Sequence, residues 1–454
     1  MEPAKRMTLV KKKLVKLQAA AGQRRGMEGP GHHGAARGGG RMNKRSMQRF
    51  YEDLLQYDFI PYWSGYVDEE YGGILNCISN AGGQLLGEDK FTWSQGRWLW
   101  ILGKLHELKK KGVFRALSRE QLEKWMKGTW DFLNQYSIYG DSVCCYVLTR
   151  DGKKKEDART GRWDASIYAD CFALIGMSQY VRTVEYREGF QNVEALQRSI
   201  VKRIEAGDFL TEPYPIPEGY QIHGIPMILV NTMHEFIRMK QSLGMDAGEE
   251  IAYARGKLKL VLDDLYDGEG HIREHKSTEE RAEKYLLDRH LNPGHTLEDA
   301  WFWIEFLEEF GGLEEYLPRI CRIVTRTFEA GWDSEYGGLL RFVDVEGGPP
   351  RGISQGGAYE KLIGETWNMK LWWPHSEILY LFPKLYEVTK EERFLEYYEK
   401  SFTYVFTTFP DIQEGEWIQI RKRDGTPEDK LVALPVKDPF HIMRNFIKIE
   451  ELCL

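Results

Sequence analysis

The most constraining feature of the chain is an eight-residue segment that occurs once near each end. Residues 68–75 read DEEYGGIL and residues 333–340 read DSEYGGLL. Each copy follows an apolar segment and leads toward a Gly-Gly pair, so each is predicted to be a connector with turn chemistry rather than a core element. A repeated unit cannot bury its apolar face alone, and its neighbours must cover that face. The repeat therefore predicts a solenoid or a closed ring.

Apolar residues recur at helical spacing through most of the chain. The pattern begins with Trp98, Ile101, Leu102, Leu105 and Leu108. Further helices are predicted at 119–136, 166–186, 222–243, 248–266, 297–310, 313–330, 370–389 and 391–408. Strand-like alternation is confined to short segments at 72–78, 142–148, 338–343 and 417–421, each predicted to form a small hairpin between helices.

About a dozen helices can form six helical hairpins, and six hairpins can close into a barrel. The predicted fold is therefore all-α, an (α/α)6 barrel with a funnel at one end and short β-hairpins in its loops. A length rule of about 150 residues per domain would give three domains. However, no linker rich in Pro or Ser interrupts residues 47–454, so these are predicted to form one large catalytic domain.

Residues 1–46 differ in kind from the rest of the chain. They hold twelve basic and two acidic residues and many glycines, and are predicted to be a disordered extension. Two interpretations stay open, an upstream extension with Met42 or Met47 as the natural start, or a targeting or nucleic-acid-binding arm. Because the whole chain carries −7, residues 47–454 carry about −17, which argues against nucleic-acid binding by the folded domain.

The composition also limits the environment and the cofactors. The sequence has no run of about 18 apolar residues, so no membrane span is expected. Its six cysteines show no CxxC spacing and follow no secretory signal, which favours free thiols in a reducing compartment, the cytoplasm. It contains neither GxxxxGK[ST] nor GxGxxG, and no nucleotide or nicotinamide cofactor is expected.

The densest polar cluster lies at 289–301, RHLNPGHTLEDAW. Thr296 is predicted to cap a helix together with Asp299, which places His295 just before the cap and Glu298 in the first turn. Such positions face a funnel more readily than a core. The HxxE spacing has no second ligand pair and HExxH does not occur, so no metal site is predicted. A purely structural His/Glu pair is the alternative.

A second cluster at 367–377, WNMKLWWPHSE, also precedes a predicted helix. It places His375 and Glu377 beside the paired tryptophans Trp372 and Trp373. Aromatic faces next to carboxylates and imidazoles suit a pyranose, whose CH faces stack while its hydroxyl groups form hydrogen bonds. Core-filling tryptophans are the alternative.

A third candidate is His441, in the run KDPFHIMR before the final predicted helix, which also carries Arg444. Taken alone, this would more often be a structural histidine.

Taken together, these motifs resemble the N-acylglucosamine 2-epimerase family, also described as renin-binding protein. The resemblance rests on RHLNPGHTLE, MKLWWPHSE, WSQGRWLW, the paired EYGG connectors and the terminal PFHIMR, and it covers the chain from about residue 50 to the end. It implies an (α/α)6 barrel, commonly a homodimer, that interconverts N-acetylglucosamine and N-acetylmannosamine without a cofactor. Related branches act on cellobiose or mannobiose, or isomerise mannose to fructose.

The resemblance also implies roles for individual residues. His295 and His441 match the family's pair of acid/base histidines, Glu298 matches the carboxylate that partners His295, and Arg97 matches the arginine near the sugar carbonyl. The remaining residues expected to bind substrate are His375, Glu377, Trp372, Asn231 and Tyr71.

Two segments depart from the family pattern. The terminal motif at 437–441 lacks the extra residues between Pro and His, and in this it resembles the disaccharide epimerases. The connector at 268–287 differs as well, close to the loops expected to set sugar size. A glycoside hydrolase on the same barrel is a weaker alternative, because it would need two carboxylates placed across a glycosidic bond. A non-catalytic binding protein would not need an acid/base set.

The expected chemistry suits these residue types. The hydrogen on C2 of an aldose becomes acidic only once the ring opens and an aldehyde forms at C1. An imidazole can accept and donate a proton near neutral pH, so one histidine on each face of C2 could remove and replace that proton. Arg97 would stabilise the enediolate oxygen, and Glu298 would orient His295.

Overall fold

The computed structural model describes residues 44–279, 284–429 and 435–454. Over these residues the chain forms an (α/α)6 barrel, which confirms the predicted fold class. The predicted extension lies outside the described residues as far as residue 43, whereas residues 44–46 form the start of helix α2. None of the described helices is long and apolar enough to cross a membrane.

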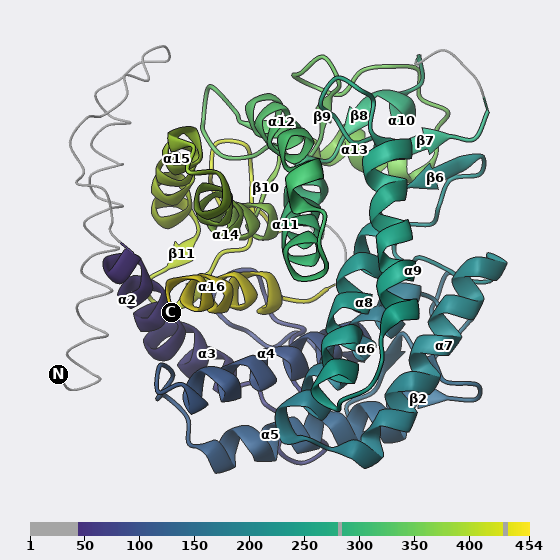
Figure 1. The fold of residues 1–454 in the computed structure, drawn as a ribbon, viewed down its shortest axis with the longest axis vertical. Helices are drawn as coiled ribbons and strands as arrows, with labels where there is room; N and C mark the ends of the chain where they lie inside the picture. The colour runs from purple at the N-terminus through teal and green to yellow at the C-terminus, as the bar shows by residue number, and fades with distance from the viewer. Residues whose placement is uncertain (1–43, 280–283, 430–434) are drawn as a thin grey trace.

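Six inner helices form a closed ring in which each packs on the next and the last packs on the first (Figure 1). In chain order they are α4 (Thr92–Lys110), α6 (Ile167–Val184), α8 (Gly224–Ser242), α11 (Pro293–Phe310), α14 (Trp372–Thr389) and α16 (Phe440–Cys453). Inner and outer helices alternate along the chain. The inner helices therefore run in the same direction, and their N-termini meet at one end of the barrel.

Each inner helix packs against an outer helix. The outer helices are α2 (Lys44–Leu54), α5 (Arg119–Phe132), α7 (Phe190–Ala206), α9 (Gly248–Lys259), α12 (Leu313–Gly331) and α15 (Glu392–Thr408). Helix α2 packs on α16, so the first and last described helices form the sixth hairpin and close the ring. Helix α2 continues without a break through a π-helical segment, Leu55–Phe59, into α3 (Ile60–Ser64), whereas α10 (Leu286–Arg289) and α13 (Ala358–Thr366) lie in loops.

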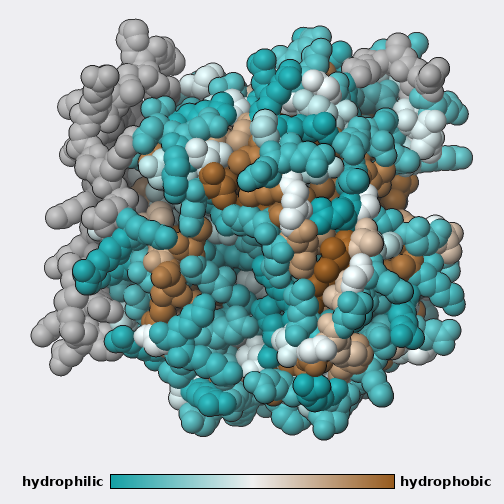
Figure 2. All heavy atoms as spheres, viewed as in Figure 1, coloured by the Kyte–Doolittle hydropathy of each residue, from teal (hydrophilic) through white to brown (hydrophobic). Residues whose placement is uncertain are grey.

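The two rings differ in how their residues are buried. Inner helices are buried on nearly all sides, whereas an outer helix such as α12 buries Tyr316, Ile320 and Val324 and exposes Glu314 and Arg322. In Figure 2 hydrophilic residues cover most of the visible face.

The eight helical ranges predicted beyond the first are confirmed. Helix α7 was not predicted, although Phe190, Val193, Leu196, Ile200 and Ile204 recur at helical spacing in its sequence.

The closest contact between inner helices joins α4 to α6 and depends on two glycines. A Cβ atom on Gly96 would lie 2.2 Å from the carbonyl oxygen of Phe172, and one on Gly176 would lie 2.1 Å from the carbonyl oxygen of Gly96. No side chain fits in these spaces, so the two backbones touch. This contact fixes the position of Arg97, the residue after Gly96, at the mouth of the barrel.

All strands are short, antiparallel and confined to the loops. The three-stranded sheet is β1 (Lys90–Phe91), β4 (Val147–Leu148) and β5 (Lys154–Lys155). The strand pairs are β2 (Ile138–Tyr139) with β3 (Val143–Cys144), β6 (Tyr220–Ile222) with β7 (His275–Ser277), β8 (His290–Leu291) with β9 (Val343–Asp344), β10 (Lys370–Leu371) with β13 (Ile420–Arg421), and β11 (Pro410–Asp411) with β12 (Glu416–Trp417). Of the predicted hairpin segments, 142–148 and 417–421 contribute strands to hairpins. Segment 72–78 forms only isolated bridges, and 338–343 forms one isolated bridge and the first residue of β9, which pairs with the distant β8.

The two copies of the repeated segment adopt the same turn and carry the same buried ion pair. Lys90 Nζ lies 2.8 Å from Asp68 Oδ2, and Lys370 Nζ lies 3.1 Å from Asp333 Oδ2. In each copy the other carboxylate oxygen accepts backbone N–H groups of the turn. The same aspartate turn recurs in the connectors before three other inner helices, at Asp157, Asp267 and Asp411. The predicted repeat is thus a recurring connector from an outer to an inner helix.

Candidate active site

Side chains from the first two turns of the inner helices converge at one end of the barrel. The guanidinium of Arg97 on α4 lies 3.9 Å from the ring centroid of Phe172 on α6. The other contributors are His223 just before α8, His295 and Glu298 on α11, Trp373 and Glu377 on α14, and His441 and Arg444 on α16. Because the N-terminus of a helix carries a partial positive charge, this arrangement favours negative charge at the site.

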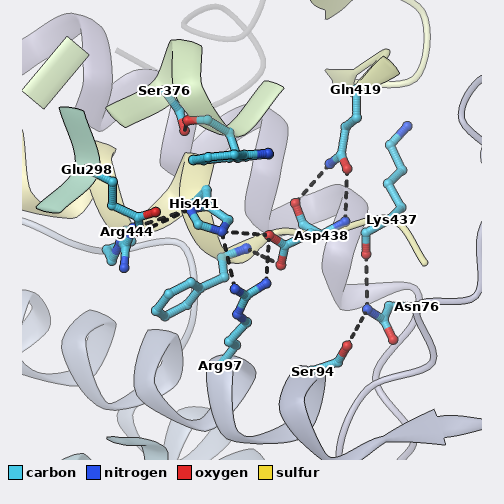
Figure 3. Close-up of polar contacts among 12 residues, drawn as sticks. Asn76, Ser94, Arg97, Glu298, Ser376, Gln419, Lys437, Asp438, His441 and Arg444 are labelled. Atoms are coloured by element: carbon cyan, nitrogen blue, oxygen red, sulfur yellow. Dashed lines mark hydrogen bonds and ion pairs between the residues drawn. The ribbon is translucent and has the colours of Figure 1, made fainter. Parts of the chain in front are cut away.

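His441 is held at both ring nitrogens (Figure 3). Its Nδ1 lies 2.7 Å from Glu377 Oε1, and its Nε2 lies 3.2 Å from a guanidinium nitrogen of Arg97. Arg97 also contacts Asp438 at 3.2 Å. The hydrogen-bond pattern places the proton on Nδ1, which donates to Glu377, and leaves Nε2 as the acceptor. Burial lowers the pKa of His441 to about 3, so the imidazole is neutral at physiological pH.

Arg444 pairs with the two carboxylates next to His441. It donates to Glu377 Oε1 at 2.5 Å and also to Glu298. Burial disfavours its charge, but Glu377 and Glu298 outweigh that effect and raise the pKa of Arg444. The second oxygen of Glu377 accepts a hydrogen bond of 2.8 Å from the indole of Trp301. Both oxygens of Glu377 therefore accept hydrogen bonds.

His295 lies on the first turn of α11 and pairs with a carboxylate from a loop. Its Nδ1 is 2.8 Å from Glu274 Oε1, so Nδ1 carries the proton and Nε2 is left as an acceptor. The predicted cap at Thr296 is wrong, because Asn292 caps the helix by accepting the His295 backbone N–H at 3.3 Å. Pro293 takes the first helical position, where its missing N–H costs nothing.

The predicted pairing of Glu298 with His295 is also wrong. Glu298 contacts Arg444 and lies 3.5 Å from Nδ1 of His441. The guanidinium of Arg444 offers Glu298 a full positive charge, whereas His295 already has Glu274 as its partner. Glu298 therefore acts on the other histidine of the site.

One indole ring lies beside both imidazoles. The Trp373 centroid is 5.4 Å from that of His295 and 5.6 Å from that of His441. Gly294 permits this packing, since a Cβ atom there would lie 2.4 Å from the Trp373 ring. The tryptophan at the site is thus Trp373 rather than the predicted Trp372, whose side chain is buried and lacks a partner for its indole N–H among the described residues.

His375 has a structural role instead of the predicted role in substrate binding. It is fully buried, its Nδ1 donates to the Leu371 carbonyl at 2.5 Å, and its Nε2 accepts the Leu339 N–H at 2.8 Å. Both ring nitrogens are therefore used by the backbone. Burial lowers the pKa of His375 to about 3, in keeping with a neutral ring.

The two remaining predicted residues stay predictions. Asn231 is nearly buried in the second turn of α8, on an inner helix of the ring. Tyr71 is 37% exposed on the first connector, where its ring lies 5.9 Å from Lys90 and 5.6 Å from Arg150. Those neighbours belong to the connector ion cluster, which makes Tyr71 the weaker candidate of the two.

Sequence reasoning missed Glu274 and His223. Glu274 lies in the charged connector before β7, where nothing in the local pattern distinguishes it from neighbouring acidic residues. His223 did leave a signal, because it stands at the start of an inner helix as His295 and His441 do. A search for histidines at predicted helix starts would have found it.

Among the residues that the structure describes, two groups of side chains bring possible metal-ligand atoms within 4.8 Å of one another, His223, Glu274 and His295, and Glu298, Glu377 and His441. In the second group Arg444 contacts both carboxylates and occupies the place of a cation. In the first, hydrogen bonds to Asp299 and between the members engage the imidazoles. The absence of a metal requirement remains a prediction.

A family model described as N-acylglucosamine 2-epimerase (GlcNAc 2-epimerase) matches residues 72–444. The chain belongs to the N-acylglucosamine 2-epimerase family. It is accordingly an isomerase-class enzyme. The N-acylglucosamine 2-epimerase of Bos taurus is 29% identical over 394 residues, covering 85% of this chain and 86% of that protein. The cellobiose 2-epimerase of Ruminococcus albus is 21% identical over 405 residues, covering 86% and 95%.

A solved structure of a sugar epimerase from a ruminal bacterium has the same fold. Its TM-score is 0.72 at 18% sequence identity, and the match covers 89% of this chain and 98% of that one. The N-acylglucosamine 2-epimerase family membership and this likeness agree with the resemblance found in the sequence motifs.

Proposed function

We propose that this member of the N-acylglucosamine 2-epimerase family interconverts N-acetylglucosamine and N-acetylmannosamine by proton transfer at C2. One observation carries the proposal. Two imidazoles, His295 and His441, lie beside the same indole ring, and each is held at Nδ1 by its own carboxylate. Each therefore presents Nε2 as an acceptor, although the sugar must first take the place of the Arg97 hydrogen bond at Nε2 of His441. Two bases on opposite faces of one carbon require such acceptors.

The mechanism starts from the open-chain sugar stacked on Trp373. One histidine removes the C2 proton through Nε2, and its carboxylate partner stabilises the imidazolium that forms. Negative charge develops on the C1 oxygen of the enediolate. Arg97 and the N-termini of the inner helices stabilise that charge. The other histidine must enter the step as its imidazolium; it delivers its Nε2 proton to the opposite face, which inverts C2 and leaves the two histidines with their protonation states exchanged.

A second substrate class has a specific observation in its favour. The terminal motif at 437–441 is short, as in the disaccharide epimerases, and Asp438 from this motif holds Arg97. Cellobiose, mannobiose and mannose are therefore the alternative substrates.

We also propose that the enzyme is cytoplasmic and a homodimer. All six cysteines are free and five of them are buried, which suits a reducing compartment. The dimer is inferred from the family resemblance. Sedimentation velocity would contradict it if the purified protein sedimented as a monomer of about 53 kDa at all concentrations.

Proton NMR of the purified enzyme in deuterium oxide tests the proposed function. N-acetylmannosamine, mannose and cellobiose are supplied separately, and the C2 proton and the products are followed. Entry of deuterium at C2 together with a mixture of both epimers supports the proposal and identifies the substrate. Absence of exchange with every one of these sugars would contradict it.

A further inference from the structure

The guanidinium of Arg97 is buried among aromatic rings and is directed by few hydrogen bonds. Its Cζ atom lies 3.9 Å from the ring centroid of Phe172 and 5.1 Å from that of Phe440. Such ring faces attract the cation but do not direct its individual N–H groups. Among the described residues, Nη1 donates to Asp438 at 3.2 Å, Nη2 donates to His441 at 3.2 Å, and Nε has no partner. Two bonds therefore set the direction of the guanidinium.

Only one of these two bonds can last through the proposed reaction. The bond to His441 has to break, because Nε2 of that imidazole must face C2 of the sugar. The bond to Asp438 can persist. Burial lowers the pKa of Arg97 to about 10, and Asp438 is the strongest of the groups that oppose this effect. Arg97 therefore stays a cation at neutral pH, with Asp438 as its lasting partner.

Asp438 is itself fixed on three sides (Figure 3). Its backbone N–H donates to Gln419 Oε1 at 2.9 Å, and its carbonyl accepts a bond of 2.9 Å from Gln419 Nε2. Its Oδ1 accepts the backbone N–H of Phe440, the first residue of α16, at 3.1 Å. Asp438 and Gln419 are both buried. Oδ2 is the oxygen left for Arg97, and its position is tied to the start of α16.

We propose that Asp438 is a positioning residue that holds Nη1 of Arg97 in place while Nη2 turns from His441 to the C1 oxygen of the bound sugar. The inference rests on the proposed function, since it describes how Arg97 is prepared to stabilise the enediolate. Asp438 Oδ2 also lies 3.7 Å from Nε2 of His441, which is too long for a hydrogen bond. Asp438 therefore acts through Arg97 rather than on the imidazole.

Asp438→Asn tests this role in kinetics. The variant keeps the size of the side chain and an oxygen for the Phe440 N–H, but it turns an NH2 group toward Arg97. The kcat of C2 exchange should fall about 10–100-fold, because a bond between charged groups is lost. KM should stay within about twofold, because the C1 oxygen becomes charged only on the way to the enediolate.

A double-mutant cycle separates positioning from a merely structural role. In an Arg97→Gln background, Asp438→Asn should cause no further fall in the rate of exchange, because the group that it positions is gone. If Asp438 only stabilised the start of α16, or acted directly on His441, the substitution would lower the rate by the same factor in both backgrounds. That additive result would overturn the proposal.

NMR of arginine-labelled protein without substrate tests the anchor itself. Rotation about the Cζ–Nη1 bond of Arg97 is followed through its Nη signals, which are assigned by their loss in Arg97→Gln. The rotation should become about tenfold faster in Asp438→Asn, because the bond that hinders it is removed. An unchanged rotation rate would also overturn the proposal.

Asp170→Asn is the matched control. Asp170 is another buried aspartate that accepts one backbone N–H, from Cys144 at 2.9 Å, and one arginine, Arg203 at 2.5 Å. This variant should leave both kcat and the Arg97 signals unchanged. The NMR measurement requires no sugar, so it tests the anchor even if the wild-type protein exchanges no C2 proton. That last result would contradict the proposed function alone.

Discussion

Replacing Glu377 by Gln should disable His441 without displacing it. Three donors converge on the Glu377 carboxylate, the Nδ1–H of His441, the Nε1–H of Trp301 and the guanidinium of Arg444. A glutamine offers one oxygen, and its NH2 group must then face at least one of these donors. The imidazolium formed during catalysis also loses its carboxylate.

The loss can be estimated from these contacts. A hydrogen bond to a charged group contributes about 1.5–3 kcal/mol, and a buried donor without an acceptor costs about 1–3 kcal/mol. Part of this cost falls on folding rather than on the transition state, which leaves about 3–4 kcal/mol for catalysis. That amount corresponds to a fall in kcat/KM of about 10²–10³-fold. The assay is epimerisation followed by NMR, with circular dichroism as a check on folding.

Glu305→Gln is the matched control. Like Glu377, Glu305 is a buried carboxylate, but it lies on α11. It pairs with Lys448 at 2.7 Å and Tyr380 at 2.7 Å and contacts neither catalytic histidine. This variant should lose stability and keep its turnover. The reasoning is refuted if Glu377→Gln retains kcat/KM within threefold of wild type, or if Glu305→Gln loses as much activity.

Three further predictions concern the scaffold. His375→Phe should leave the Leu339 N–H unpaired and lower the free energy of unfolding by about 1–3 kcal/mol in urea denaturation, with kcat/KM retained. Gly96→Ala should destabilise by about 3 kcal/mol or more, because its Cβ would meet a carbonyl oxygen of α6, whereas Gly256→Ala, with open space around it, should not. Burial raises the pKa of Glu450 to about 8, so it contributes a fall in stability as pH rises from about 4.5 to 8, and that fall should be smaller in Glu450→Gln.

Much of the fold was predictable because its signals are local. Buried faces repeat at helical spacing, so helix positions could be predicted, and the two EYGG segments indicated a repeated architecture. Helix α7 carries a local signal comparable to that of α5 and was nevertheless not predicted. The packing of α2 on α16, which closes the ring, could not be predicted either, because it depends on contact between the two ends of the described chain.

The sequence predicted which residues belong to the site but not how they pair. The sequence motifs led to His295, His441, Glu377 and Arg97, all of which the structure brings to the mouth of the barrel. Which groups pair could not be predicted, because partners such as Glu274 come from loops whose position depends on tertiary packing. A histidine next to a glutamate in sequence is not thereby its partner in space.

Which side chain of a motif faces the site also depends on the helix orientation. Trp373 lies beside both imidazoles, whereas Trp372 and His375 from the same nine-residue motif turn into the core. Rotation about a helix axis is fixed by packing against neighbouring helices, and the motif alone does not contain that information.

The most direct test of the two-base mechanism is C2 deuterium exchange by single-histidine variants. His295→Gln and His441→Gln are each incubated with N-acetylglucosamine and, separately, with N-acetylmannosamine in deuterium oxide. The account predicts that both variants lose epimerisation, and that any remaining exchange in each is confined to one epimer, the opposite one in the two variants. Near-normal epimerisation by either variant would contradict the account.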